Sequence, residues 1–520
     1  MSTMLRRLAV VALLAFPSSL RAQASAATDP LIRQVRAWRV ANAASVLQEF
    51  SALLAQPNQA SDAVNIRKNA EMIRALYERR GVTTRLLESP GSPPAVYGER
   101  LTPGATRTLL IYVHYDGQPV RPAEWTMKAY EPQVLAGRLE DKAEKKSLAD
   151  AARPENENWR IYARSASDDK APVIALLAAL DALAATRTRV PANIKFFFEG
   201  EEEAGSPHLE AMLTRHRALL GADVILFFDG PRHQSGMRQV VFGVRGSYDV
   251  ELTAYGPARP LHSGHYGNWA PNPAVRLARF LGTLRDDDGQ ILIPRYYEDV
   301  RAISAAERAA LSTVPNADAK LREELMLGRS EAGNASLSER IMLPALNLRG
   351  IVAGGVGAGA TNAVPAIARA SIDFRLVPNQ TPARVRELFE AHAVAQGWTV
   401  IHDTAEATPA LRRANDKVLL LQWIDGYPAE RTALDHPMAR DVSRIIERAT
   451  GEALALVPTS GGSAPLYVFN QVLKTPIVSV PIANYDNSQH APNENIRLKE
   501  FWEAIEMYAA LLARLGAPVP

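Results

Sequence analysis

The sequence predicts an α/β fold: a doubly wound, mostly parallel sheet with a smaller α+β domain inserted into it. Three mostly apolar runs, at residues 108–113, 194–198 and 224–228, are separated by helical patterns. Such runs are typical of parallel strands buried on both faces. Between residues 242 and 411 the pattern changes to strands of alternating polarity combined with helices. This alternation is typical of a sheet with one buried face, so we expect a separate, smaller domain there.

The other elements follow from the spacing of apolar residues. The spacing is helical from residue 28 to 80, and further helices are expected at 173–185 and 381–396. After residue 412 helical and buried-strand patterns return, with an apolar run at 477–480. We therefore expect the larger domain to comprise residues 25–241 and 412–520, with residues 242–411 inserted between its two parts.

The N-terminus has the features of a secretory signal peptide, assigned to residues 1–24. Arg6 and Arg7 precede an apolar run from Leu8 to Phe16, and Ala22-Gln23-Ala24 offers a cleavage site of small residues. The apolar run is too short to span a bilayer. The mature chain is therefore expected to be secreted or periplasmic, without a membrane partner once the signal has been removed.

Composition excludes several functions. A formal net charge of +3 over 520 residues gives no support for nucleic-acid binding. The absence of cysteine excludes disulfides and thiolate ligands, so any metal must be held by His, Asp and Glu, which suits Zn²⁺, Mn²⁺ or Co²⁺. The charged tract at 138–157 is expected to be a solvated insertion without a chemical role.

One cluster of carboxylates stands out at a strand end. Glu199, Glu201, Glu202 and Glu203 directly follow the apolar run 194–198. The carboxyl ends of strands in an open α/β sheet are where ligands bind. Four acids within five residues repel one another, so they either lie on a solvated loop or surround a cation. The cluster alone does not decide between these interpretations.

Histidines and acids at the other strand ends favour the cation. Two histidines together with several carboxylates match the donors of a site for two metal ions, which needs a bridging carboxylate and a further carboxylate to deprotonate water. A lone histidine at a strand end is more often an ordinary polar residue, but here the candidates recur at successive strand ends. They are His114, Asp116, Asp168, Glu202, Glu203, Asp229 and His490.

The candidate residues lie in motifs that resemble those of the M20 metallopeptidase family, the dinuclear hydrolases related to carnosinase and carboxypeptidase G2. The resemblance extends from about residue 35 to 515. Two further motifs, Leu261–Gly264 and Phe374–Asn379, match the family's inserted lid or dimerisation domain. The motifs that carry the resemblance occur in family order: His114-x-Asp116, Ser167-Asp168-Asp169-Lys170, Glu199-Gly-Glu-Glu202-Glu203-x-Gly205, Phe228-Asp229 and His490-x-x-Asn493-Glu494.

The resemblance implies a ligand set for two divalent ions, Zn²⁺ with Mn²⁺ or Co²⁺ as alternatives. His114 would bind one ion and His490 the other, with Asp168 bridging them. Glu203 and Asp229 would complete the set.

It also implies roles for residues around the ions. Glu202 would be the general base, and Asp116 would accept a hydrogen bond from the His114 ring. His262, contributed by the other subunit in dimeric relatives, would bind the developing oxyanion, and Arg375 would hold a substrate carboxylate. A homodimer is implied by the inserted domain.

The expected function is therefore hydrolysis of amide bonds in a peptide or an N-acyl amino acid. Dipeptidase or carboxypeptidase activity and N-acyl-amino-acid deacylation are alternatives. In the dipeptidase branch an acid precedes a Gly-Gly-Ser turn, whereas Ser460 holds that place here, which weakens the case for a strict dipeptidase. A catalytically silent binding protein is a third alternative, disfavoured because Glu202 and every ligand candidate are present. Glu201 is expected to face solvent.

Overall fold

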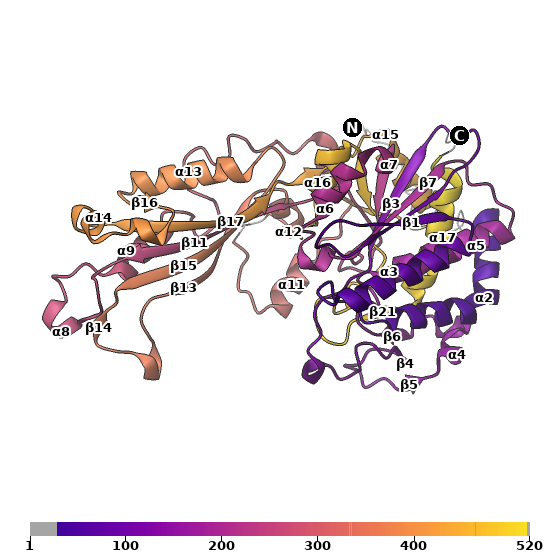
Figure 1. Ribbon diagram of the computed structural model, residues 1–520, viewed down its shortest axis with the longest axis horizontal. Helices are drawn as coiled ribbons and strands as arrows, with labels where there is room; N and C mark the ends of the chain where they lie inside the picture. Colours follow the sequence, from indigo (N-terminus) through magenta and orange to yellow (C-terminus); the bar gives the residue numbers. More distant parts are fainter. Residues whose placement is uncertain (1–28, 332, 334, 463, 517–520) are drawn as a thin grey trace, which may run out of the picture.

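The larger domain is organised around an eight-stranded sheet, and the smaller one around a five-stranded sheet. The computed structural model describes residues 29–331, 333, 335–462 and 464–516. The two domains form separate lobes of an elongated molecule (Figure 1). The signal-peptide assignment, residues 1–24, lies outside the described residues.

The large sheet confirms the expected α/β architecture. Its four central strands, β7, β3, β8 and β20, are mutually parallel, whereas β1–β2, β2–β7 and β20–β9 pair antiparallel. The strand order is β1 (Thr83–Leu87), β2 (Ala95–Arg100), β7 (Asn193–Glu199), β3 (Thr108–His114), β8 (Val224–Phe227), β20 (Ile477–Ser479), β9 (Gln239–Val241) and β19 (Ala455–Val457).

Both faces of this sheet are covered, which explains why its central strands are apolar throughout. In β3, Leu109, Ile111 and Val113 enter one core, and Leu110 and Tyr112 enter the core on the opposite face. Helices contributing to the first core are α2 (Pro30–Leu54), α3 (Ala63–Glu78), α5 (Lys170–Ala185), α15 (Pro437–Thr450) and α17 (Leu498–Arg514). Those contributing to the second are α6 (Leu209–Arg215), α7 (Arg217–Leu220) and α16 (Leu466–Leu473).

The inserted domain has a mostly antiparallel sheet covered on one face. Its strand order is β13 (Ala345–Val352), β15 (Ile367–Leu376), β11 (Gly246–Tyr255), β17 (Val418–Tyr427) and β16 (Thr399–Ile401). Helices α9 (Pro273–Leu281) and α13 (Pro382–Ala395) pack against it through a core of their own. Because β17 belongs to this sheet, the inserted domain extends beyond residue 411, where the sequence patterns placed its end.

The tract at 138–157 is more structured than a solvated insertion. It contributes β5 (Lys145–Lys146) and α4 (Leu148–Ala151), and the Ala151 side chain is buried in the main core. Strand β5 lies at the edge of a sheet with β4 (Gln133–Leu135), β6 (Arg160–Tyr162) and β21 (Asn495–Arg497).

Short elements complete the described part of the chain. They are β10 (Gly243–Val244), β12 (Leu261–His262), α8 (Ser263–Tyr266), α10 (Ala305–Leu311), α11 (Asp318–Glu324), α12 (Leu337–Ile341), β14 (Ala363–Val364), α14 (Pro409–Ala414) and β18 (Glu430–Arg431). Within the residues that the structure describes, no helix combines the length and the apolar composition needed to cross a membrane.

Candidate metal centre

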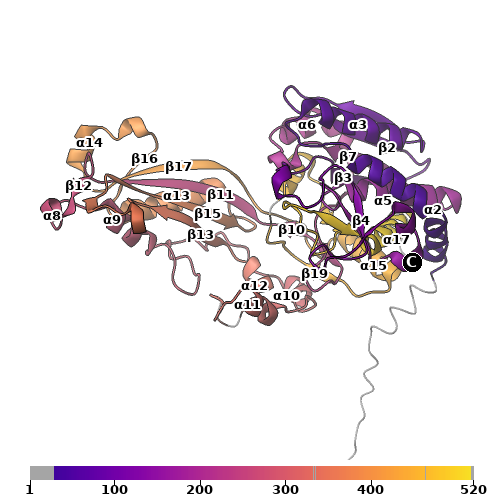
Figure 2. The same ribbon diagram turned by 90° about the horizontal axis from the view of Figure 1, so that it is seen from below.

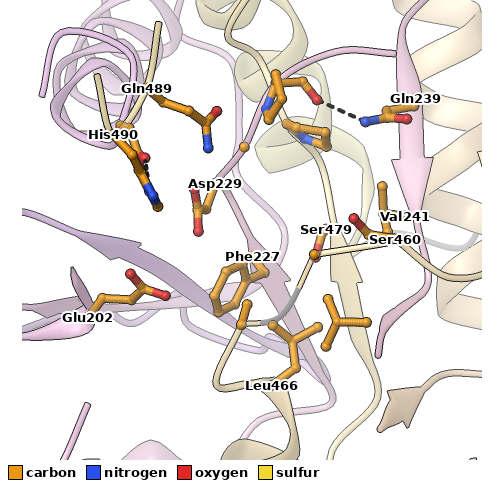
Figure 3. A pocket seen from close by; sticks show the side chains of 17 residues that line it. Glu202, Phe227, Asp229, Gln239, Val241, Ser460, Leu466, Ser479, Gln489 and His490 are labelled. Carbon is orange, nitrogen blue, oxygen red and sulfur yellow. Dashed lines mark hydrogen bonds and ion pairs between the residues drawn. The ribbon is translucent and has the colours of Figure 1, made fainter. Parts of the chain in front are cut away.

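The candidate ligands converge at the carboxyl ends of the central strands. His114 is the last residue of β3, the acidic turn follows β7, and Asp229 follows β8. The loop between β6 and α5 adds Asp168, and the segment between β20 and β21 adds His490. Figure 3 shows Glu202, Asp229 and His490 around one cavity. Five separate segments of the chain thus deliver polar side chains to one edge of the sheet, as the strand-end pattern predicts.

Asp168 lies between the two histidines. Its Oδ1 is 2.9 Å from His114 Nε2, and its Oδ2 is 3.1 Å from His490 Nε2. Each carboxylate oxygen therefore faces a different imidazole. This is the arrangement that a carboxylate needs in order to bridge two cations, each also bound by one histidine.

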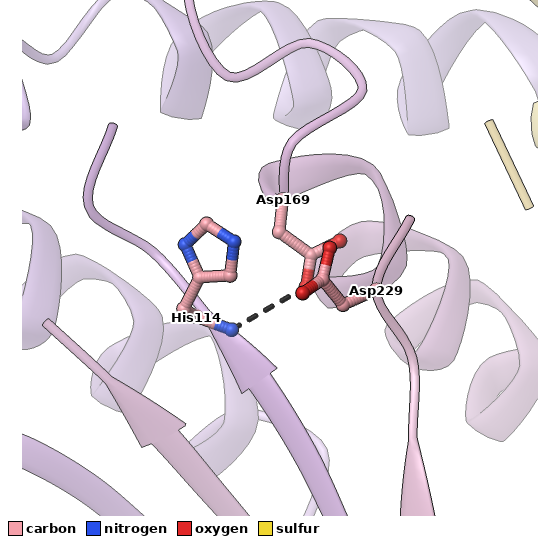
Figure 4. A group of neighbouring side chains, drawn as sticks. All are labelled: His114, Asp169 and Asp229. Carbon is pink, nitrogen blue, oxygen red and sulfur yellow. Dashed lines mark hydrogen bonds between the residues drawn. The ribbon is translucent and has the colours of Figure 1, made fainter. Parts of the chain in front are cut away.

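The remaining donors form two groups around this bridge. In one group, His114, Asp169 and Asp229 offer ligand atoms within 4.8 Å of one another (Figure 4). In the other, Asp168, Glu203 and His490 do the same. Asp169, which the sequence did not suggest as a ligand, also accepts a hydrogen bond from the backbone N–H of His114 at 3.4 Å.

The electrostatics of the site call for positive charge. Burial, together with the charge of Asp168, raises the pKa of Glu203 to about 7 and that of Asp229 to about 6. Burial also raises the pKa of Glu202 well above its usual range. Although burial opposes the effect, hydrogen bonds from His114 and His490 lower the pKa of Asp168. Two divalent cations would relieve this crowding of carboxylates, and the nitrogen and oxygen donors suit Zn²⁺, Mn²⁺ or Co²⁺.

Asp116 connects His114 to the acidic turn. Asp116 Oδ1 lies at ion-pair distance from the histidine, 3.3 Å from His114 Nδ1. The same carboxylate accepts the backbone N–H groups of Glu202, at 3.1 Å, and Glu203, at 3.0 Å. It therefore orients a ligand ring and the turn that carries the proposed base.

A cavity of about 180 Å³ opens beside the ligands. Beside the candidate ligands, its wall combines apolar side chains, such as Phe227 and Val241, with the uncharged polar residues Gln239, Ser460 and Ser479 (Figure 3). Apart from Asp168, Glu202 and Asp229, no carboxylate lines the cavity in the described part of the chain.

His262 and Arg375 are not brought to this cavity. Strand β12, which ends at His262, and the adjoining α8 lie at the end of the inserted domain farthest from the large sheet (Figures 1 and 2). Arg375 lies on β15, with Nε 3.3 Å from Asp373 Oδ2, and neither residue is among those lining the cavity. Their roles stay predictions.

The structure gives Glu201 and Glu494 surroundings that the sequence did not predict. The expectation that Glu201 faces solvent is wrong: it is buried, and it accepts from the backbone N–H and ring Nδ1 of His208 at 3.1 and 2.9 Å. Glu494 was assigned no role, although it is fully buried beside Asp168. Its place in the His490-x-x-Asn493-Glu494 motif was the available signal.

Comparisons with known proteins find relatives among the metallodipeptidases. The chain is 26% identical over 437 residues to the Cys-Gly metallodipeptidase of Schizosaccharomyces pombe, covering 82% of this chain and 84% of that protein. It is 24% identical to the human Beta-Ala-His dipeptidase, covering 82% of this chain and 78% of the relative.

Solved structures share the fold. A M20 family metallo-carboxypeptidase from Sulfolobus solfataricus superimposes with a TM-score of 0.71 at 28% identity, covering 91% of this chain and 99% of that one. Human carnosine dipeptidase 1 gives a TM-score of 0.70 at 20% identity, covering 94% and 99%, which supports the fold alone. The sequence model of peptidase family M20/M25/M40 matches residues 110–514. The chain therefore belongs to this peptidase family and is a metallopeptidase.

Proposed function

We propose that this protein hydrolyses peptide bonds of small peptides with two divalent metal ions, of which Zn²⁺ suits the donors best. The observation that carries the proposal is the position of Asp168, one oxygen toward His114 and the other toward His490. His114 and Asp229 would hold one ion and His490 and Glu203 the other, with Asp168 shared.

The two ions and Glu202 would have different roles in the proposed reaction. When bound, the two ions polarise the scissile carbonyl and lower the pKa of a water molecule towards neutrality. Glu202 takes the proton of this water and returns one to the leaving amine. Its position at the cavity, on a turn held by Asp116, suits that role.

The substrates we propose are dipeptides or peptides cleaved at their carboxyl end. The named activities of the relatives, dipeptidases and a metallo-carboxypeptidase, support this class. Arg375 would hold the substrate carboxylate once the inserted domain closes over the cavity, through two parallel hydrogen bonds.

Deacylation of N-acyl amino acids is a second candidate. A free α-amino group is a cation and needs a carboxylate partner when it is buried. The described cavity wall beyond the metal ligands instead presents Gln239, Ser460 and Ser479, which are uncharged. An acylated nitrogen fits such a wall without an unpaired charge.

We further propose that the protein is a homodimer that is secreted or periplasmic. The position of β12 and α8, remote from the cavity of their own chain, supports a site completed by His262 of a second copy (Figures 1 and 2). The signal-like sequence at residues 1–24 supports export.

The experiment that tests the function combines metal analysis with a substrate panel. We expect two divalent ions per chain and hydrolysis of dipeptides, N-blocked dipeptides or N-acyl amino acids. Glu202→Gln should keep both ions and lose activity by about 10²–10⁴-fold, the range for a general base, while Glu210→Gln, an exposed change on α6, should leave both unchanged. Metal-loaded wild type without activity on the panel would favour a silent binding protein, and activity in Glu202→Gln would remove Glu202 from the role of base.

A further inference from the structure

Glu494 is a buried carboxylate that the mechanism above does not use. It is fully buried and lies four residues after His490, next to strand β21. Its carboxylate accepts several hydrogen bonds. Within the described part of the chain, all the donors belong to one loop, residues 164–168, which ends at Asp168. This concentration of contacts on the loop of a single ligand calls for an explanation.

Both carboxylate oxygens of Glu494 take part. Oε1 accepts the backbone N–H groups of Ser167 and Asp168 and the Ser167 hydroxyl, each at 2.9 Å. Oε2 accepts the backbone N–H of Ser165 and Nη1 of Arg164, again at 2.9 Å. With five donors within hydrogen-bond distance, all of the roughly four lone-pair sites of an ionised carboxylate are engaged.

These bonds fix the peptide groups from which the Asp168 side chain projects. The backbone N–H of Asp168 is itself one of the donors, so rotation of this peptide group would break a buried hydrogen bond. The Asp168 carboxylate must keep one oxygen toward each histidine to serve both ions. A displacement of about one ångström at such a position is sufficient to impair a metal or catalytic site.

The same short segment also provides the ligand on the other side of the bridge. His490 faces Asp168 Oδ2, and Glu494 holds the Asp168 backbone, so the two ends of residues 490–494 act on one side chain. Between them, Asn493 accepts the backbone N–H groups of Thr126 and Met127 at 3.0 Å, which ties the segment to the loop that precedes β4.

We propose that Glu494 is the positioning residue that holds the Asp168 carboxylate between the two metal positions. The Arg164 guanidinium balances its charge and stacks 5.0 Å over the Trp125 ring. The inference rests on the two-metal site proposed above, and wild-type protein that binds fewer than two ions would refute that site rather than this role.

The test is Glu494→Gln in the full-length protein loaded with Mn²⁺. An amide has one accepting oxygen, so its NH₂ group must face N–H donors on one side of the side chain. We expect affinity for at least one ion to fall about 10–100-fold, as for other groups that support metal ligands. The EPR signature of two coupled Mn²⁺ ions should weaken, and kcat should fall more than KM rises.

Glu307→Gln is the matched control. Glu307 is a buried glutamate on α10 that accepts from Arg431 at 2.9 Å and from the backbone N–H of Ser304 at 2.7 Å, and it does not line the cavity. Its replacement should lower the midpoint of thermal unfolding but leave metal affinity and the EPR spectrum unchanged. Wild-type affinity and spectrum in folded Glu494→Gln would overturn the proposal.

A milder variant keeps the test decisive if Glu494→Gln does not fold. Ser167→Ala removes only the hydroxyl donor to Oε1. We expect it to weaken metal binding and Mn²⁺ coupling in the same direction by a smaller factor. Wild-type binding and coupling in Ser167→Ala, with Glu494→Gln unfolded, would mean that Glu494 serves stability alone and would overturn the proposal.

Discussion

Asp116 accepts the backbone N–H of Glu202 at 3.1 Å while the same oxygen lies 3.3 Å from the His114 ring. One buried carboxylate thus sets the orientation of a metal ligand and of the turn that carries the proposed base. An outer carboxylate of this kind fixes the tautomer of the ring and raises its basicity.

Asp116→Asn should therefore weaken metal binding about 10–100-fold, because its NH₂ group cannot accept a hydrogen bond, so one of the two backbone N–H groups, that of Glu202 or of Glu203, loses its acceptor. Titration with Zn²⁺ or Mn²⁺ measures the effect. Asp223→Asn is a suitable control, since Asp223 accepts the backbone N–H of Thr108 at the opposite end of β3, at 2.7 Å. Equal metal affinity in the two variants would contradict the role of Asp116.

If the active site is shared between two subunits, two inactive variants should complement each other when they are mixed. His262→Ala and Glu202→Gln should each be nearly inactive alone. If His262 serves the partner's cavity, mixing under conditions of subunit exchange should restore about a quarter of wild-type activity, because half of the dimers then hold one complete site of two. Absence of recovery, with mixed dimers present by native mass spectrometry, would argue against the exchange of His262 between subunits.

Ser460 offers a test of substrate class. Ser460→Asp places a carboxylate in the uncharged wall of the cavity. It should raise kcat/KM for Ala-Leu relative to N-acetyl-Ala-Leu by roughly tenfold or more, the worth of one charge-assisted hydrogen bond. Ser460→Ala is the control for loss of the hydroxyl. An unchanged ratio in Ser460→Asp would mean that the α-amino group binds elsewhere.

Metal binding should depend on pH through the buried carboxylates. In the absence of ions, the raised pKa values of Glu203, about 7, and Asp229, about 6, keep these groups partly protonated near neutrality. Cations require the ionised form, so affinity should fall as the pH is lowered through this range and binding should release protons. Calorimetry in buffers of different ionisation enthalpy measures the release, and its absence at pH 6–7 would contradict this account.

The sequence predicted the large sheet well because its signals are local. In β3 an unbroken apolar run records burial on both faces, and His114 at its end marks the edge where ligands collect. The end of the inserted domain was misplaced for a related reason. Residues 418–421 of β17 are all apolar and buried, like a strand of the large sheet, but they pair with β11 in the inserted domain. Strand pairing is a tertiary property that such a run does not encode.

The candidate ligands could be selected from the sequence, whereas the residues that support them could not. Histidines and acids recur at strand ends, and the order of the motifs along the chain further narrows the set of candidate ligands. The buried contacts of Glu201 with His208 and of Glu494 with the Asp168 loop depend on long-range packing. A glutamate carries no local mark of burial, since its side chain is ordinarily solvated.

The proposed metal ligands lie on both sides of the inserted domain in the chain: His114, Asp168, Glu203 and Asp229 precede it, and His490 follows it. A growing polypeptide therefore cannot assemble the pair of metal positions until its final helix-forming region is being synthesised. Binding of both ions at the proposed site therefore requires residue 490, which is made after the whole of the inserted domain. A fragment ending before residue 490 lacks the second histidine, however well its central strands fold.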